Sequence, residues 1–303
     1  MSIPEDRSSI DTEKRNPKSS QLHQLNPEEC VRLIQREDLA VHRAMEEASS
    51  SIEKFLDDAT PRFCRGGRLV YFGAGTSGRL GVLDASEAPP TFQVEPGRVI
   101  GIIAGGDGAL RKSSEGKEDD PDGALPELKA IELTSDDILI GIAAGGTTPY
   151  VRGGLEWATS SNTPPLTALL TCSDVSIPHG VNHRLFLETG PEVLTGSTRM
   201  KAGTATKLCL NTISTTLMIQ EGRVYENLMV DVRASNKKLK DRAARILCSL
   251  SKLNRQEAFS RLNACDGHLK TALVSARCAC SFEEAQNKLK QAPLSHWLDK
   301  KAN

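Results

Sequence analysis

The sequence has no excess of positive or negative charge, no long hydrophobic runs and no paired cysteines. Its 38 basic and 39 acidic residues leave a formal net charge of -1, which excludes the strong positive charge that draws proteins to nucleic acid or anionic lipid. No stretch approaches the roughly 20 apolar residues that a membrane span requires, and the polar N-terminus has no apolar signal segment. We therefore expect a cytoplasmic protein that acts on a small molecule, with neither nucleic acid nor a membrane as partner.

The spacing of the cysteines indicates neither disulfide bonds nor a metal site. None of the eight is spaced as CxxC, and in an unsecreted chain buried thiols are expected rather than disulfides. Cys278 and Cys280 have His268 as their nearest histidine, but no second ligand pair follows at zinc-site spacing. The sequence predicts no metal site.

Helix signals mark both ends of the chain. Capping-box patterns, in which a glutamate follows the N-cap residue by three positions, begin at Asn26, Asn254 and Ser281. Residues 1–58 are predicted to form an N-terminal helical arm, and residues 223–303 a small helical C-terminal region.

Residues 59–222 are predicted to form the central domain. Short apolar runs alternate here with helical segments, namely RLVYF, RVIGIIA, DILIGIAA, LTALLTC and RLFLE. Their continuous apolarity indicates strands covered on both faces, and the alternation with helices indicates a parallel sheet. The sequence therefore predicts an α/β fold with a doubly wound parallel sheet.

Ligands of such sheets bind beyond the carboxyl ends of the strands. The loop after RLVYF reads GAGTSGR and places Gly75, Thr76 and Ser77 before a helix, with amide and hydroxyl donors that suit a phosphate or a sugar. A nicotinamide dinucleotide would require a carboxylate about 20 residues further on. Because Gly105 and Gly106 occupy that position, a phosphosugar site is favoured over a dinucleotide site.

The loop after DILIGIAA has a similar composition. Gly145, Gly146, Thr147 and Thr148 precede a predicted helix start at Pro149. This loop is predicted either to cradle a phosphate or to be an ordinary strand-to-helix turn that Thr148 caps.

Two glutamates lie near these loops. Glu87 stands in DASEAPP, where Pro89 and Pro90 are predicted to end the helix, and Glu115 follows the glycine pair after RVIGIIA. A lone glutamate is more often a solvated surface charge. Two glutamates near neighbouring ends of the sheet form a candidate acid/base pair.

Six segments together resemble a known family. They run in order from Thr12 to Asn236 and read TEKRNP, GAGTSGRLGVLDASEAPPTF, GIIAGG, GIAA, GPEVLTGSTRMKAGTATKL and NLMVDVRASN. These strings resemble the signature segments of N-acetylmuramic acid 6-phosphate etherases. The resemblance implies a sugar isomerase (SIS) fold, a homodimer, and no metal or redox cofactor. It also implies a lyase of amino-sugar catabolism and cell-wall recycling, which cleaves the lactyl ether of N-acetylmuramate 6-phosphate to N-acetylglucosamine 6-phosphate and D-lactate.

The resemblance also assigns residues. It implies that Glu87 is the catalytic acid and that Glu115 is the second catalytic glutamate, which we assign as the base because the reaction needs one carboxyl group to donate a proton and another to remove one. The predicted substrate-binding residues are Gly75, Thr76, Ser77, Gly145, Gly146, Thr147, Thr148, Ser197 and Lys201. An alternative function is a non-catalytic SIS module that senses a sugar phosphate and regulates another protein, but the presence of both glutamates favours the enzyme.

One loop departs from the family pattern. The family usually has serine, glycine, arginine and threonine where this chain has Gly145 to Thr148, so a hydroxyl and a guanidinium are missing. Arg199 or Lys201, in the segment GSTRMK, is a candidate to supply the lost positive charge. The alternative is that this segment is a capped helix start with solvated charges.

Overall fold

The computed structural model describes residues 6–112, 115–234 and 236–299, except the side chain of Glu115. The chain forms two compact units. The first comprises Met1–Glu87 and Pro96–Leu217, and the second comprises Ala88–Glu95 and Met218–Asn303. The predicted division at residues 58 and 222 stays a prediction.

A five-stranded parallel sheet forms the centre of the first unit, with the strand order β2-β1-β3-β4-β5. The strands are β1 (Leu69–Gly73), β2 (Val99–Ile103), β3 (Ile138–Ile142), β4 (Leu166–Thr171) and β5 (His183–Phe186). Every residue of β1, β3 and β4 is buried, as the continuous apolar runs predicted. The chain passes from β1 to β2 on one side and to β3 on the other, so the strand order reverses between β1 and β3.

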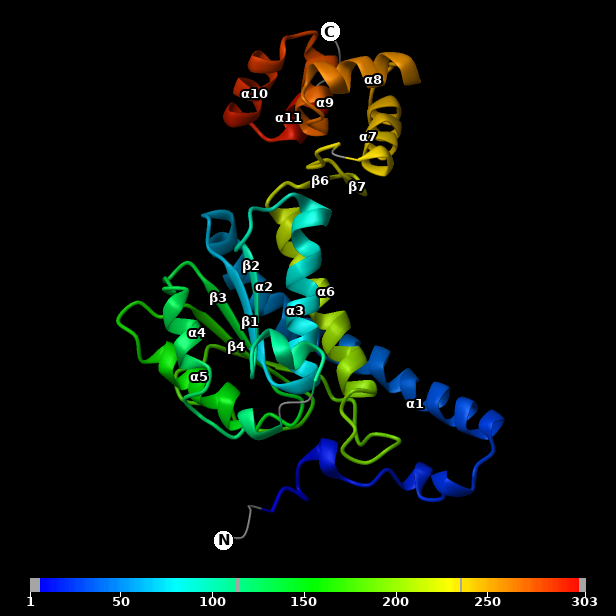
Figure 1. Cartoon of the computed structure of the whole chain (residues 1–303), viewed down its shortest axis with the longest axis vertical. Helices are drawn as coiled ribbons and strands as arrows, with labels where there is room; N and C mark the ends of the chain where they lie inside the picture. Colours follow the sequence, from blue (N-terminus) through cyan, green and yellow to red (C-terminus); the bar gives the residue numbers. More distant parts are fainter. Residues whose placement is uncertain (1–5, 113–114, 235, 300–303) are drawn as a thin grey trace. The chain divides into compact units, whose positions relative to one another are not determined.

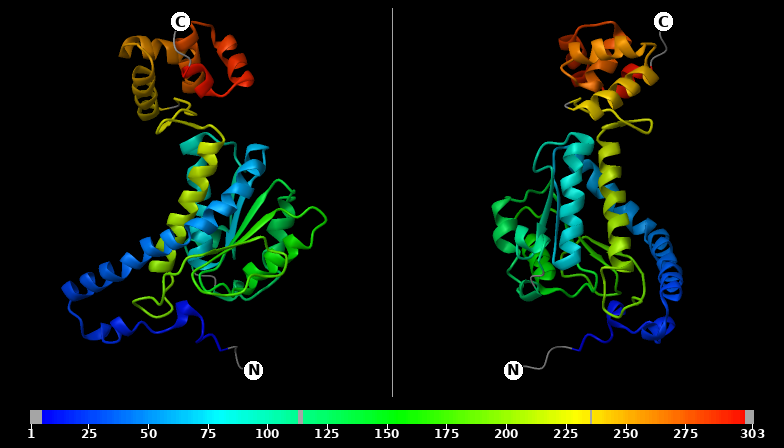
Figure 2. Two further views of the ribbon diagram at one scale, coloured as in Figure 1. Left: turned by 180° about the vertical axis from the view of Figure 1, so that it is seen from behind. Right: turned by 45° about the vertical axis from the view of Figure 1, so that its right-hand side comes forward.

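Helices cover both faces of this sheet. The helices of the first unit, two of which extend into the second, are α1 (Pro27–Glu47), α2 (Ser49–Cys64), α3 (Gly75–Phe92), α4 (Leu125–Ala130), α5 (Pro149–Thr159) and α6 (Lys201–Gln220). Figures 1 and 2 show α4 and α5 on one face and α2, α3 and α6 on the other. Neighbouring side chains of β1 serve the two faces: the Tyr71 hydroxyl donates to Asp84 of α3, and Phe72 packs against Gly154 of α5.

Helix α3 corrects one expectation. Pro89 and Pro90 were expected to end it, but it continues to Phe92, and the amide of Gln93 donates to the carbonyl of Pro89 at 2.9 Å. The fixed φ of proline is compatible with a helix, and what two prolines remove is two amide donors. The helix ends instead where Gln93 takes a left-handed φ of 53°.

The arm that precedes the sheet begins with three 3-10 turns, η1 (Asp11–Glu13), η2 (Pro17–Ser19) and η3 (Leu22–Gln24). The predicted capping box of α1 is confirmed, with Asn26 and Glu29 bonded to each other's backbone amides. In Figure 1, α1 extends away from the sheet and the chain before it returns toward the sheet.

The second unit is mainly helical, as predicted. It contains α7 (Lys237–Leu250), α8 (Arg255–Ala264), α9 (Leu269–Cys278), α10 (Phe282–Gln291) and α11 (Leu294–Leu298). Capping boxes at Asn254 and Ser281 are confirmed. A short hairpin of β6 (Val224–Tyr225) and β7 (Leu228–Met229) was not predicted, because strands this short carry no periodic signal. No helix in the described part of the chain is long and apolar enough to cross a membrane.

Candidate functional site

The glycines of the first loop bring a strand and a helix close together. A Cβ on Gly78 would lie 2.5 Å from the carbonyl oxygen of Gly73, so the first turn of α3 packs directly on the end of β1. Helix α3 starts at Gly75, followed by Thr76 and Ser77. The first amides of a helix lack acceptors within it, and they carry the positive end of the helix dipole. This loop therefore offers amides and hydroxyls to an anion.

The third loop, residues 144–148 at the end of β3, has a similar geometry. Gly146 has a φ of 72°, and a Cβ there would lie 2.3 Å from Val175 Cγ2, so both backbone and packing require glycine. Pro149 begins α5, and Thr148 stands at its N-cap without a side-chain cap hydrogen bond. Of the two alternatives for this loop, the one in which the Thr148 side chain caps the helix is therefore wrong, and Thr148 lines a cavity.

A third segment reaches the same place from the N-terminus. Thr12 is fully buried, and its amide donates to Ser173 Oγ at 3.3 Å, just beyond β4. Asp11 accepts from the amide of Asp174 at 3.0 Å. These bonds hold the segment across the carboxyl ends of the strands, where Arg7 Nη2 donates to Thr147 Oγ1 at 3.0 Å.

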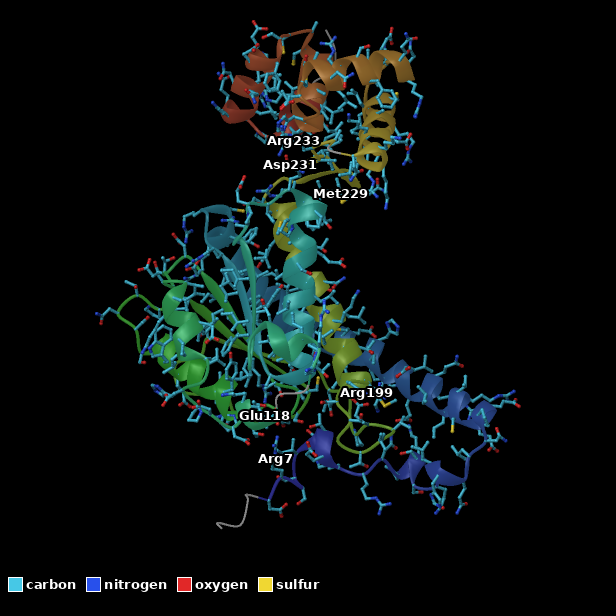
Figure 3. The ribbon with its side chains drawn as sticks, in the orientation of Figure 1. Arg7, Glu118, Arg199, Met229, Asp231 and Arg233 are labelled. Atoms are coloured by element: carbon cyan, nitrogen blue, oxygen red, sulfur yellow. The ribbon has the colours of Figure 1, made fainter. Side chains whose placement is uncertain are left out.

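These segments enclose a cavity of about 250 Å³ beside the carboxyl ends of β1 and β3. It is lined by Arg7, Glu13, Ala74, Gly75, Thr76, Ser77, Glu118, Asp119, Ala144, Thr148, Pro149, Gly196 and Thr198. Figure 3 shows Arg7 and Glu118 on the same side of the first unit, below the sheet. The point where the strand order of a doubly wound sheet reverses is where such folds bind ligands.

The cavity contains part of the predicted site. Of the predicted binding residues, Gly75, Thr76, Ser77 and Thr148 line it. Its other lining residues do not include Gly145, Gly146, Thr147, Ser197 or Lys201. Gly196 and Thr198, which flank Ser197, do line it. The binding role of the five residues outside the lining stays a prediction.

Lys201 is held elsewhere by an ion pair. Its Nζ lies 3.2 Å from Glu37 Oε2, and both side chains are buried. Burial alone would raise the pKa of Glu37, but hydrogen bonds from Lys18, Asn16 and Lys201 outweigh it and lower the pKa to about 2. Glu192 accepts from the amides of Lys201 and Ala202 and so caps α6. The start of α6 is thus capped, as the structural alternative predicted, but Lys201 is not solvated.

The two predicted catalytic glutamates occupy different surroundings. Glu87 is exposed on α3, about three helical turns or about 16 Å from Thr76 at about 1.5 Å of rise per residue. Glu115 begins the turn η5 (Glu115–Lys117), near the cavity-lining Glu118 in sequence, and its side chain lies outside the described residues. One chain therefore does not bring Glu87 to the cavity.

Sequence reasoning missed four charged residues of the cavity. Glu118 and Asp119 share a loop with Glu115, so their position was a signal that could have found them. The carbonyl of Glu118 accepts from the amide of Tyr150 at 3.1 Å, which fixes this loop to α5. Arg7 and Glu13 come from the arm, and no local pattern connects them with loops more than a hundred residues later.

Comparison with known proteins identifies the family. The N-terminal SIS domain family of glucokinase regulatory protein matches residues 47–159. An N-acetylmuramic acid 6-phosphate etherase of Staphylococcus epidermidis is 46% identical over 285 residues, covering 93% of this chain and 95% of that protein. The etherase of Bacillus subtilis is 45% identical over 293 residues, and the match covers 96% of this chain and 96% of that protein. This chain belongs to the N-acetylmuramic acid 6-phosphate etherase family.

The parallel sheet with helices on both faces confirms the predicted doubly wound fold, and the matching family model is that of an SIS domain. A solved structure of an Escherichia coli protein matches 67% of this chain and 97% of that one at 16% identity, with a TM-score of 0.46. The etherase relatives match nearly the whole chain, whereas the regulatory-protein domain matches only residues 47–159. The non-catalytic sensor is therefore not favoured.

Proposed function

We propose that this chain is a carbon–oxygen lyase of the cytoplasm that cleaves the lactyl ether of N-acetylmuramate 6-phosphate to N-acetylglucosamine 6-phosphate and D-lactate. The observation that carries the proposal is the cavity at the ends of β1 and β3, in a chain of the etherase family. Thr76, Ser77 and Thr148 supply hydroxyls there, and α3 begins beside them. Amides and hydroxyls at a helix start suit the phosphate of a sugar.

The reaction needs two groups that transfer protons. In the open-chain sugar the hydrogen on C2 is acidic because it lies next to the aldehyde, and a carboxylate removes it. The electron pair of the C2–H bond forms a C2–C3 double bond, the C3–O bond breaks, and a carboxyl group protonates the departing lactate. Water then adds its hydroxide to C3 and its proton to C2. Two carboxyl groups in opposite protonation states suffice for every step.

Glu87 is proposed as the acid and Glu115 as the base. Glu87 lies about three turns along α3 from the loop where the phosphate is proposed to bind, and it does not line the cavity. The family resemblance also implies a homodimer. We therefore propose a homodimer in which each site combines the cavity of one chain with Glu87 of its partner.

Exposed apolar side chains support this association. Val31 and Leu39 of the projecting helix α1 are 53% and 69% exposed, and Leu83 lies one turn before Glu87 on α3 at 46%. A second copy would cover such residues.

The direct test is release of D-lactate from N-acetylmuramate 6-phosphate by the purified chain, with Glu87→Gln and Glu115→Gln as variants. Each substitution keeps the shape and removes the titratable group, so turnover should fall by about 100-fold or more. Glu95→Gln, another exposed carboxylate that does not line the cavity, is the control and should keep full turnover. Near-normal turnover in both catalytic variants would contradict the assignment.

A further inference from the structure

The charges around the cavity are unequal. Glu13, Glu118 and Asp119 contribute three carboxyl groups, and Arg7 is the one basic side chain among the described residues that line it. A phosphate monoester carries between one and two negative charges at neutral pH. Three carboxylates would repel such a group unless a cation lay beside it. Arg7 is therefore the cation that the described lining of this cavity offers to such an anion.

The guanidinium of Arg7 also lies where it can contact an anion in this cavity. Its Nη2 donates to Thr147 Oγ1 at 3.0 Å, which puts the guanidinium at the mouth of the third loop. That hydrogen bond uses one of the five donors that a guanidinium has. Ser77 and Thr148 line the same cavity, so hydroxyls and guanidinium converge on one space.

The third loop departs from the family pattern at the place where it contacts this arginine. A Cβ added to Gly145 would lie 3.4 Å from Arg7 Nη2, which is ordinary van der Waals contact, so the guanidinium lies directly against this loop. An arginine at position 147, as in the usual family pattern, would remove the hydroxyl that accepts from Arg7 and set a second positive charge beside it. Thr147 and Arg7 are thus mutually consistent.

The segment that carries Arg7 is fixed before any ligand arrives. Ile10 and Thr12 are buried, and Thr12 is bonded to Ser173 beyond β4. A side chain on an anchored segment loses less conformational entropy on binding than one on a mobile terminus.

We propose that Arg7 binds the 6-phosphate of the substrate, so that the N-terminal segment supplies the positive charge that the third loop lacks. This inference rests on the proposed function. It replaces the expectation that Lys201 or Arg199 compensates, because Lys201 is paired with Glu37 and Arg199 does not line the cavity. A guanidinium suits this role because it can donate two parallel hydrogen bonds to a phosphate.

The test compares Arg7→Gln with Arg15→Gln, an exposed arginine of the same segment that does not line the cavity. The Michaelis constant for N-acetylmuramate 6-phosphate and the dissociation constant of N-acetylglucosamine 6-phosphate, measured by calorimetry, should each rise about 10-fold or more in Arg7→Gln. Both should stay unchanged in Arg15→Gln. The double variant Arg7→Gln, Thr147→Arg should recover most of the loss, because it returns a guanidinium to the same space.

The product probe separates the two anions of the substrate. N-acetylglucosamine 6-phosphate has the phosphate but not the lactyl carboxylate, so an effect of Arg7→Gln on the substrate alone would mean that Arg7 binds the carboxylate and would overturn the proposal. An effect in Arg199→Gln with none in Arg7→Gln would overturn it too. Arg7-dependent binding of the product by a chain that releases no D-lactate would refute the proposed reaction and leave the phosphate site standing.

Discussion

Glu37 shows how a single residue joins the arm to the domain. It accepts from Asn16 at 2.6 Å and from Lys18 at 2.9 Å, both in the arm, and from Lys201 at the start of α6. An isolated buried carboxylate would be strongly destabilising, and here three donors hold it ionised. Removing it would leave the buried ammonium of Lys201 without its counter-charge.

We predict that Glu37→Gln lowers the free energy of unfolding by about 3 kcal/mol at neutral pH. The folded pKa of Glu37 is about 2 and its unfolded pKa about 4.5, so the unfolded chain binds the proton more readily. The stabilisation is therefore complete above about pH 4.5 and is lost as the pH falls toward 2. Urea unfolding of wild type and variant between pH 3 and 7 measures this.

Lys18→Gln is the control for that experiment. The side chain of Lys18 is 73% exposed, and an exposed ion pair contributes about 1 kcal/mol or less. A difference between wild type and Glu37→Gln that did not shrink in acid would mean that Glu37 is not ionised in the folded chain.

Position in the sequence determines which residues of the candidate site could be predicted. Thr76, Ser77 and Thr148 follow directly after predicted strands, and parallel strands bring such loops to one edge. Arg7 and Thr147 are separated by 140 positions, and only the folded chain brings them together. Lys201 was a candidate for the positive charge that the third loop lacks, but in the folded chain it is buried and pairs with Glu37.

At the scale of elements, Asp84 fixes α3 to its neighbours. Tyr71 of β1 donates to one carboxylate oxygen at 3.0 Å, and Ser214 of α6 donates to the other at 3.1 Å. Burial raises the pKa of Asp84, and the two hydrogen bonds oppose this. Asp84 precedes Glu87 by about one turn of α3, so these bonds also fix the position of the proposed acid.

We expect Asp84→Ala to lower the free energy of unfolding by about 2 kcal/mol, because it leaves two hydroxyls without their acceptor. Asp84→Asn should cost less than about 1 kcal/mol, since an amide can still bond to both hydroxyls and no charge is buried. Denaturant midpoints of the two variants decide between them. Equal losses would show that the charge of Asp84, rather than its hydrogen bonds, joins the elements.

Elements were predicted where their signals are local. The five strands follow from continuous apolar runs, and the three capping boxes follow from residue pairs within one turn. The end of α3 was not predicted, because the left-handed residue Gln93 determines it rather than the preceding prolines. A left-handed glutamine has no sequence signature of the kind that glycine gives.

At the scale of the whole molecule, the proposed dimer predicts complementation between two inactive chains. Glu87→Gln keeps the cavity and loses the proposed acid, whereas Ser77→Asp keeps that acid and sets a negative charge where the phosphate is proposed to bind. Coexpressed in equal amounts, they should recover about a quarter of wild-type turnover, because half of the dimers are mixed and each of these has one intact site. D-lactate release measures the recovery.

Coexpression of Glu87→Gln with a chain that carries both substitutions is the matched control, and it should stay inactive. Light scattering should report twice the chain mass for every preparation. Full activity in a wild-type monomer, or no recovery in verified mixed dimers, would rule out shared sites.

The arm has a consequence for how the chain is made. The amide of Thr12 can bond to Ser173 only once Ser173 has been synthesised, and Asn16 bonds to Glu37, which also pairs with Lys201. At about 5–20 residues per second, synthesis from residue 12 to residue 201 takes roughly 10–40 s. During that time the strands of the sheet can pair, while Arg7, which is synthesised before them, still lacks Thr147 as its partner. The cavity is therefore among the last parts of the first unit to be completed, and residues synthesised before the sheet complete it.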